Sequence, residues 1–324
     1  MFVKLYVGIL GIGEEMLYRE FGRTGWQVSV IGLGTWNIGN QWGEMEDSTA
    51  HDIVRTAFDH GMNLFDTAES YGIPNGLSEI RLGRALQGIR DQVRIVSKVG
   101  NWGKRTGQGI PKTTVDMIRG CGHACLGRLR SDWIDVLLCH EGDIQDPSVY
   151  IAGFEALRME GFICEYGIST NDLQVLENFY ATSDGKCAVV EVDYSLINRV
   201  AEKEFLSFCQ KNKIGVLARG PLAMGILADK YDTDTVFMDV VRNKWNQGES
   251  GRMEYEEKLA GLDRVKSVAS SDCDLVTTGL KYVISHAVEP VAIPGATSVS
   301  QVRMNAKAGA SVLPDDELAR LKAL

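Results

Sequence analysis

The sequence predicts a closed (β/α)8 barrel (TIM barrel), an α/β fold in which eight parallel strands are each followed by a helix. Short apolar runs alternate along the chain with longer segments of helical periodicity, which is typical of crossover units in a parallel sheet. Runs such as Val93–Lys98 and Ile134–His140 are mostly apolar, as expected for strands buried on both faces. The 324 residues are enough for one such barrel.

The expected elements follow one another in a regular order. The predicted strands are Ile31–Thr35, Asn63–Asp66, Val93–Lys98, Ile134–His140, Glu165–Ser169, Ala188–Val192, Gly215–Ala218 and Val291–Pro294. The predicted helices are Thr49–His60, Glu79–Gln87, Thr113–Leu129, Val149–Met159, Leu173–Tyr180, Glu202–Asn212, Leu275–Ser285 and Ser300–Ala308. A last helix is expected after Pro314, because three acidic residues follow it and the helix dipole favours acids in a first turn.

An open, doubly wound sheet is the alternative architecture. It would normally show a glycine-rich turn after its first strand. The segment Ile31–Gly39 has spaced glycines but not the G-x-G-x-x-G order, and a polar loop follows it instead of a helix. We therefore expect a single barrel domain over residues 16–324. Residues 1–15 are too short and too interrupted for an export signal or a membrane span, and we treat them as an extension or an extra edge strand.

One connection is unusually long. Residues 219–273 separate the seventh strand from the next clear helix. A loop of this length in a compact domain usually forms a lid or a binding element. The alternative is a helical excursion that packs on the barrel, and the helical pattern of Met253–Val268 fits that interpretation in part.

Composition excludes several classes of partner. The formal net charge of −9 leaves no excess of Lys and Arg for a run of phosphates, so nucleic acid and anionic membranes are not expected partners. The seven cysteines form no CxxC pair and no His is spaced to complete a zinc site, so we predict no metal. Reduced thiols of this kind are typical of a cytoplasmic protein. No oligomeric state is predicted.

Titratable side chains follow three consecutive predicted strands. Asp66 ends the second strand and Tyr71 lies five residues further on, Lys98 ends the third, and His140 ends the fourth. Each alone could be a capping, surface or core residue. In a barrel of this type, however, the C-terminal ends of the strands form one face, and that face carries the active site. We therefore expect these four residues to lie together.

Their chemistry is mutually consistent. A neighbouring ammonium favours the phenolate form of tyrosine, so Lys98 is expected to lower the pKa of Tyr71. A buried lysine needs a counter-ion, and Asp66 is the candidate. His140 could then donate a hydrogen bond to a substrate oxygen and orient it. The four residues form a tetrad built around a general acid.

At these residues the sequence resembles the aldo-keto reductases, from Tyr18 to the C-terminus. The matching motifs are Phe21–Gly25, Val28–Trp36, Gly61–Gly72, Ser97–Gly100, Asp135–His140, Gly167–Thr170, Pro221–Leu227 and Ile293–Asn305. The resemblance implies a barrel capped by an N-terminal hairpin, here about Leu17–Val30. It also implies hydride transfer between a nicotinamide cofactor and a carbonyl, with Tyr71 as general acid/base, Asp66 and Lys98 tuning it, and His140 orienting the substrate.

The resemblance also implies a cofactor site. Its residues would be Gly34, Trp36, Ser169, Thr170, Glu191, Arg219, Pro221, Leu222, Gly225, Lys230, Gly295, Thr297, Gln301 and Asn305. Glu191 stands where the family usually has Gln, and Arg219 where it often has an aromatic residue. Gln301 stands where some members have an Arg for the 2′-phosphate, with Arg303 two residues later. NADP is the expected cofactor on family habit, and NAD is the alternative.

Four residues on the first strand-to-helix loops are candidates for the substrate pocket: Trp36, Trp42, Trp102 and Glu141. The tryptophans could instead be ordinary loop packing. An acid at Glu141, where the family often has an aromatic residue, suggests a polyol, sugar or cationic substrate. The expected function is reduction of a small aldehyde, ketone or sugar. The alternatives are oxidation of an aldose, a regulatory subunit that binds the cofactor with negligible turnover, and, with little support, a metal-dependent hydrolase.

Overall fold

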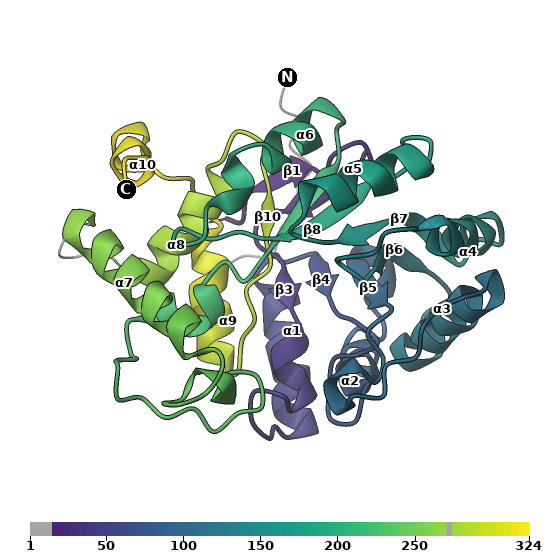
Figure 1. Ribbon diagram of the computed structural model, residues 1–324, viewed down its shortest axis with the longest axis horizontal. Coiled ribbons are helices and arrows are strands. Elements are labelled where there is room, and N and C mark those ends of the chain that lie inside the picture. Colours follow the sequence, from purple (N-terminus) through teal and green to yellow (C-terminus); the bar gives the residue numbers. More distant parts are fainter. Residues whose placement is uncertain (1–14, 270–273) are drawn as a thin grey trace.

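The computed structural model describes residues 15–269 and 274–324. Within them, eight parallel strands form one sheet in which each strand pairs with the next along the chain. They are β3 (Leu33–Gly34), β4 (Leu64–Asp66), β5 (Arg94–Val99), β6 (Ile134–Cys139), β7 (Ile163–Ser169), β8 (Val189–Asp193), β9 (Gly215–Arg219) and β10 (Val291–Ala292). Parallel bridges from Ile31 to Ala292 and from Gly34 to Gly295 join the first strand to the last. The sheet therefore closes into the predicted barrel, with helices around it (Figure 1).

The helices follow the strands as the sequence predicts, with ends that differ by a few residues. In the described residues they are α1 (Asp47–Asp59), α2 (Leu77–Ala85), α3 (Val115–Leu129), α4 (Ser148–Met159), α5 (Leu173–Thr182), α6 (Phe205–Lys211), α7 (Arg252–Val268), α8 (Leu275–Ile284), α9 (Val299–Ala308) and α10 (Asp315–Lys322). In α1 the buried residues Ala50, Ile53, Val54 and Ala57 recur at helical spacing. This apolar stripe fixes which side of the helix packs on the sheet.

Several predicted elements are shorter than expected, among them the first strand, which was predicted over Ile31–Thr35 and is found at Leu33–Gly34. The helix predicted from Glu202 begins at Phe205, because Val200–Glu202 forms a 3-10 turn in which the Glu202 carboxylate accepts hydrogen bonds from two buried tyrosines. The last strand ends before Pro294, which has no N–H to donate to the ladder. At the same closure a Cβ on Gly34 would lie 2.7 Å from the carbonyl oxygen of Ile293, so only glycine fits there.

A hairpin closes the end of the barrel that lies opposite the C-terminal ends of the parallel strands. Strands β1 (Tyr18–Glu20) and β2 (Gln27–Ser29) pair antiparallel, as the resemblance implied for Leu17–Val30. Phe21 and Val28 of this hairpin belong to the apolar cluster inside the barrel. These two side chains therefore close the opening of the barrel at the N-terminal ends of its strands.

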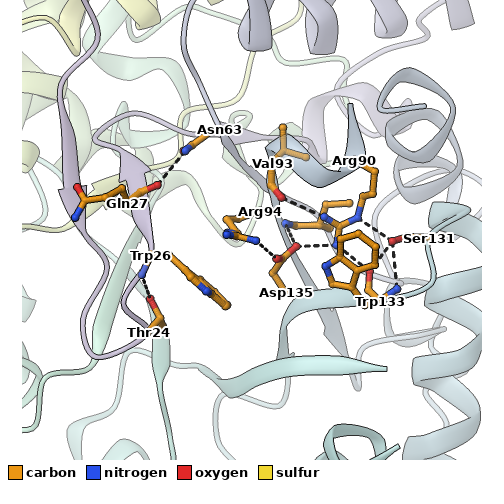
Figure 2. A network of polar contacts seen from close by, with 11 residues as sticks. Thr24, Trp26, Gln27, Asn63, Arg90, Val93, Arg94, Ser131, Trp133 and Asp135 are labelled. Atoms are coloured by element: carbon orange, nitrogen blue, oxygen red, sulfur yellow. Dashed lines mark hydrogen bonds and ion pairs between the residues drawn. The ribbon is translucent and has the colours of Figure 1, made fainter. Parts of the chain in front are cut away.

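A polar network centred on Asp135 lies beside this hairpin (Figure 2). The buried Asp135 carboxylate accepts hydrogen bonds from Arg90 at 2.7 Å, from Arg94 at 2.9 Å and from the Ile95 backbone N–H at 2.9 Å. The Arg94 guanidinium also lies over the ring of Trp26, 4.9 Å from its centroid. The network links strands β5 and β6 to the hairpin.

The long segment after β9 has a core of its own. Four aromatic rings pack together, with centroids between 5.2 and 5.5 Å apart: Tyr231, Phe237, Trp245 and Tyr255. Arg242 extends from this cluster and lies over the ring of Trp42, 5.0 Å from its centroid. The segment therefore combines a packed helical excursion, α7, with a connection to the loop after β3.

The predicted extension falls almost wholly at residues 1–14, which lie outside the described residues, as does Cys273. Among the residues described, none of the helices has the length and apolarity needed to cross a bilayer.

Candidate active site

The strands place inward-facing side chains in layers. Alternate residues of a strand point to the same face, so residues two apart lie one above the other inside the barrel. The apolar cluster inside the barrel includes Leu64, Val96, Leu138 and Val189. Two residues further along the same strands come Asp66, Lys98, His140 and Glu191. A polar layer therefore lies directly above an apolar one, at the C-terminal ends of the strands.

Lys98 is the centre of this layer. Its side chain is fully buried, and Nζ lies 2.5 Å from Asp66 Oδ1 and 3.0 Å from Glu191 Oε2. Nζ also donates to the Thr67 carbonyl oxygen at 2.9 Å and to the Tyr71 hydroxyl oxygen at 3.2 Å. The structure thus brings together Asp66, Lys98 and Tyr71, as the sequence predicted. It also adds Glu191 to this group.

The charges of this cluster act on one another. Burial disfavours the charged form of Lys98, but Asp66 and Glu191 outweigh it and raise the lysine pKa above its ordinary value. Burial also raises the pKa of Asp66, with Glu191 adding to the effect. The ammonium is therefore retained, held between two acidic side chains.

Lys98 lowers the pKa of Tyr71, as the sequence predicted, but other contributions to that pKa are larger. Burial raises it, Lys98 lowers it, and the carboxylates of Asp66 and Glu191 raise it again, so the net pKa lies above the ordinary value. The effect expected of Lys98 is therefore present, but burial and the two carboxylates outweigh it. Tyr71 holds its proton at neutral pH and is ready to act as an acid.

His140 completes the layer next to Tyr71. The two rings meet edge to face with centroids 5.9 Å apart. Burial lowers the pKa of His140 well below its usual value, and the positive charges of Lys98, Arg219 and Lys104 lower it further. The imidazole is therefore neutral at pH 7 and can donate one hydrogen bond to a ligand oxygen.

Aromatic rings form the wall beside Tyr71. Trp36 stacks on the Tyr71 ring at 5.7 Å, and Trp42 meets Trp36 edge to face at 5.2 Å. Gln41, which the sequence analysis did not single out, fixes this arrangement. Its Oε1 accepts from the Trp36 indole N–H at 2.8 Å and from the Gly72 backbone N–H at 2.7 Å.

A cavity of about 1280 Å³ opens above the layer. Asp66, Tyr71 and His140 line it, and Lys98 lies beneath them. Every residue that the resemblance assigned to the cofactor lines the same cavity: Gly34, Trp36, Ser169, Thr170, Glu191, Arg219, Pro221, Leu222, Gly225, Lys230, Gly295, Thr297, Gln301 and Asn305. Residues at the ends of the eight strands, or directly after them, therefore meet around one space with residues of the long segment after β9.

The start of α9 forms one end of this cavity. Gln301 Oε1 accepts from the Thr297 backbone N–H at 2.7 Å and from the Thr297 hydroxyl at 3.1 Å. The side chain of Gln301 is therefore engaged at the helix terminus. Arg303 lines a separate surface groove with Lys281 and Lys307, and is not among the residues that line the large cavity.

Comparison with known proteins agrees with this geometry. A family model described as "Aldo/keto reductase family" matches residues 30–324. The chain belongs to the aldo/keto reductase family.

Similar aldo/keto reductases include solved structures and characterised enzymes. An aldo-keto reductase from Bacillus halodurans, in its holo form, is 26% identical with a TM-score of 0.79, and the match covers 95% of this chain and 96% of the other. An aldo/keto reductase from Klebsiella pneumoniae in complex with NADP and acetate is 29% identical with a TM-score of 0.69, over 96% and 95% of the two chains. The NADH-specific methylglyoxal reductase of Escherichia coli is 29% identical over 89% of this chain and 91% of its own.

Two of the residues predicted for the substrate pocket lie elsewhere in this aldo/keto reductase. Trp36 and Trp42 line the cavity, but Trp102 and Glu141 are not among its lining residues. The ring of Trp102 packs against the Arg128 guanidinium, with 5.0 Å between Cζ and the ring centroid. Glu141 Oε1 accepts a hydrogen bond of 2.5 Å from the Tyr150 hydroxyl. Both side chains have partners on the helix side of their loops.

We therefore expect Glu141→Gln to leave substrate preference unchanged. The amide oxygen can still accept from Tyr150, and no carboxylate is removed from the cavity wall. The measurement is the ratio of kcat/KM values for a sugar, a neutral aldehyde and a cationic aldehyde in wild type and variant. A change in their order would restore Glu141 as a determinant of substrate choice.

Two cations of this aldo/keto reductase were missed by the sequence analysis. Lys104 and Arg105 lie on a 3-10 turn, Lys104–Thr106, that follows β5, and both line the cavity. Neither makes an ion pair with a carboxylate in the part of the chain that the structure describes. The sequence did contain a signal for these two cavity residues, because adjacent basic residues follow shortly after the end of a predicted strand.

Proposed function

We propose that this chain is a nicotinamide-dependent oxidoreductase that reduces the carbonyl group of a small aldehyde, ketone or sugar, with NADP(H) as the preferred cofactor. The observation that carries the proposal is the buried Lys98, which contacts Asp66 and the Tyr71 hydroxyl at the floor of a cavity of about 1280 Å³. That cavity is larger than the usual range of about 300 to 1,000 Å³ for ligand sites and has room for a dinucleotide and a small substrate. A bound nicotinamide supplies the hydride.

The protein residues handle the proton and the orientation of the substrate. In reduction, the Tyr71 hydroxyl donates its proton to the substrate oxygen as negative charge develops there. Lys98 stabilises the phenolate that remains, and Asp66 holds the ammonium in place. Neutral His140 donates a hydrogen bond to the same substrate oxygen and fixes its position. Oxidation of an alcohol runs these steps in reverse.

The residues around the cavity suit a dinucleotide. Ser169, Thr170, Glu191 and Arg219 would hold the nicotinamide end, and Pro221, Leu222, Gly225 and Lys230 would follow the pyrophosphate. Gly295, Thr297, Gln301 and Asn305 would hold the adenosine end, where the N-terminus of α9 presents backbone N–H groups to an anion. The exposed amine of Lys230 has no ion-pair partner among the described residues and is available to a phosphate.

The first measurement to make is the preference of the protein for NADPH or NADH. NADPH carries a 2′-phosphate that NADH lacks. Lys230, which has no ion-pair partner among the described residues, lines the cavity, as do Lys244 and Lys258, which both pair with Glu254. We expect kcat/KM for NADPH to exceed that for NADH by about tenfold or more, since one such charge contact is worth at least about 1.4 kcal/mol when partly desolvated. Initial rates with methylglyoxal, glyceraldehyde and glucose would check this. A preference for NADH would reverse the cofactor assignment, and no turnover with either would overturn the proposed function.

Two alternatives share the same residues. An aldose dehydrogenase would use the same tetrad mainly in the oxidative direction, and initial rates of glucose oxidation with NADP or NAD would distinguish it. A regulatory subunit would bind the cofactor without turnover, and the close Asp66, Lys98 and Tyr71 contacts favour catalysis instead. We further propose a single catalytic domain over residues 16–324, a cytoplasmic location, and small molecules rather than nucleic acids as ligands.

A further inference from the structure

Glu191 occupies an unusual position for a carboxylate. It lies on β8, is 1% exposed, and approaches Lys98 of β5 across the barrel interior, since β5 and β8 are not neighbours in the sheet. Its Oε1 lies 3.5 Å from the Ser169 hydroxyl. Its Oε2 has no hydrogen-bond partner other than the ion contact of 3.0 Å with Lys98 Nζ. Glu191 therefore depends on Lys98 for compensation of its charge.

The ammonium group of Lys98 therefore interacts with three side chains at once: Glu191, Asp66 and Tyr71. The same ammonium lies 2.5 Å from Asp66 Oδ1 and 3.2 Å from the Tyr71 hydroxyl oxygen. Two carboxylates and one phenol therefore share a single positive charge. Because like charges disfavour each other, each carboxylate makes the phenolate form of Tyr71 more costly. Asp66 alone would suffice as the counter-ion of Lys98, so Glu191 is a second acid in excess of that need, and it raises the pKa of Asp66 as well.

The other ionisable groups at this end of the barrel leave that excess in place. His140 is neutral, because burial and nearby cations lower its pKa. Arg219 interacts with Asp193 at 4.0 Å and donates to Asn171 at 3.0 Å, both at the rim of the cavity. Lys104 lies on the exposed turn after β5. No cation other than Lys98 is in contact with Glu191 among the described residues.

We infer that Glu191 is a positioning residue, which as a second counter-ion of Lys98 draws the ammonium away from Tyr71 and shifts proton transfer at Tyr71 to higher pH. The inference rests on the proposed function, since it assigns a role within that reaction. It gives this chain a wider pH range in which the phenol stays protonated and can donate to a carbonyl oxygen.

Glu191→Gln tests the inference directly. Glutamine keeps the size of the side chain and can still accept from Lys98, but it has no negative charge. The pKa of Tyr71 should then fall toward its ordinary value. Carbonyl reduction declines as the phenol loses its proton, and alcohol oxidation rises over the same range. We expect both limbs of log kcat/KM against pH to move to lower pH by about one unit or more.

Two control variants separate charge from shape. Glu191→Asp keeps the charge on a shorter side chain, and its limbs should stay close to those of the wild type. Asp193→Asn removes a carboxylate two residues further along β8, beyond contact with Lys98, and should not move the limbs. The inference would be overturned if the limbs of the pH profile coincided in the wild type and Glu191→Gln. It would also be overturned if Asp193→Asn shifted the limbs as far as Glu191→Gln does. Circular dichroism would establish that each variant is folded, and if Glu191→Gln does not fold, Glu191→Met carries the same expectation.

The outcomes also distinguish this inference from the proposed function. If the wild-type protein reduces an aldehyde but its pH profile does not respond to Glu191→Gln, only the role of Glu191 is wrong. If the wild type turns over no carbonyl compound with NADPH or NADH, the proposed function itself fails.

Discussion

Tyr71→Phe should reduce the rate of carbonyl reduction by about 10³-fold, within the range of 10² to 10⁴ that a general acid contributes. Phenylalanine keeps the ring that stacks on Trp36 at 5.7 Å, so the wall of the cavity is preserved. It removes only the hydroxyl group, 3.2 Å from Lys98 Nζ, that we propose as the proton donor. The rate of cofactor oxidation, measured with saturating NADPH and a reactive aldehyde, would show the loss.

Tyr180→Phe is the matched control for this experiment. Tyr180 packs against Phe208 on the outside of the barrel and does not line the cavity, so the rate should stay within about twofold of the wild type. Cofactor affinity, measured by quenching of tryptophan fluorescence, should be similar in all three proteins. A Tyr71→Phe variant that keeps more than a tenth of the wild-type rate would rule out Tyr71 as the acid.

Asp135→Asn should give the largest loss of stability among single substitutions in the polar network. The carboxylate is fully buried and forms an ion pair with both Arg90 and Arg94 (Figure 2). Breaking a buried ion pair by removal of one partner typically costs 3 to 5 kcal/mol. Because the Arg94 side chain is 34% exposed and can be hydrated, we expect a loss of about 2 to 4 kcal/mol in the free energy of unfolding.

Urea unfolding followed by tryptophan fluorescence measures this change. The control is Asp116→Asn, which removes an acid that is 84% exposed and pairs with Arg119 on the surface of α3. That substitution should change the free energy of unfolding by less than about 1 kcal/mol. Equal effects of the two substitutions would contradict the structural role of Asp135.

The fold was predictable because its signals are local. A parallel barrel buries both faces of its strands, so apolar runs such as Ile134–Cys139 stand out, and helices such as α1 carry a clear apolar stripe. The tetrad was predictable for a related reason: titratable residues directly after such runs have to lie on one face of the barrel. The ends of the elements were less certain, as the late start of α6 shows.

The surroundings of the tetrad could not be predicted, because they depend on contacts between residues that are not adjacent in the sequence. Glu141 could be placed on the right loop, but its bond to Tyr150 decides that it turns away from the cavity. The contact between Glu191 and Lys98 exists only because the sheet closes and brings β5 and β8 face to face. The direction of the Tyr71 pKa shift followed mainly from the degree of burial, with the carboxylates of Asp66 and Glu191 adding to it, and a sequence pattern specifies neither the burial nor the Glu191 contact.

The two-residue step between the apolar and polar layers has a consequence for how this protein can change. Leu138 supports the barrel and His140 faces the cavity, yet both belong to one continuous stretch that leads out of one strand. Selection or a protein engineer can therefore exchange residues of the upper layer while the lower layer continues to seal the barrel. New activities can arise on this scaffold by substitution at alternate positions, without a new core having to evolve.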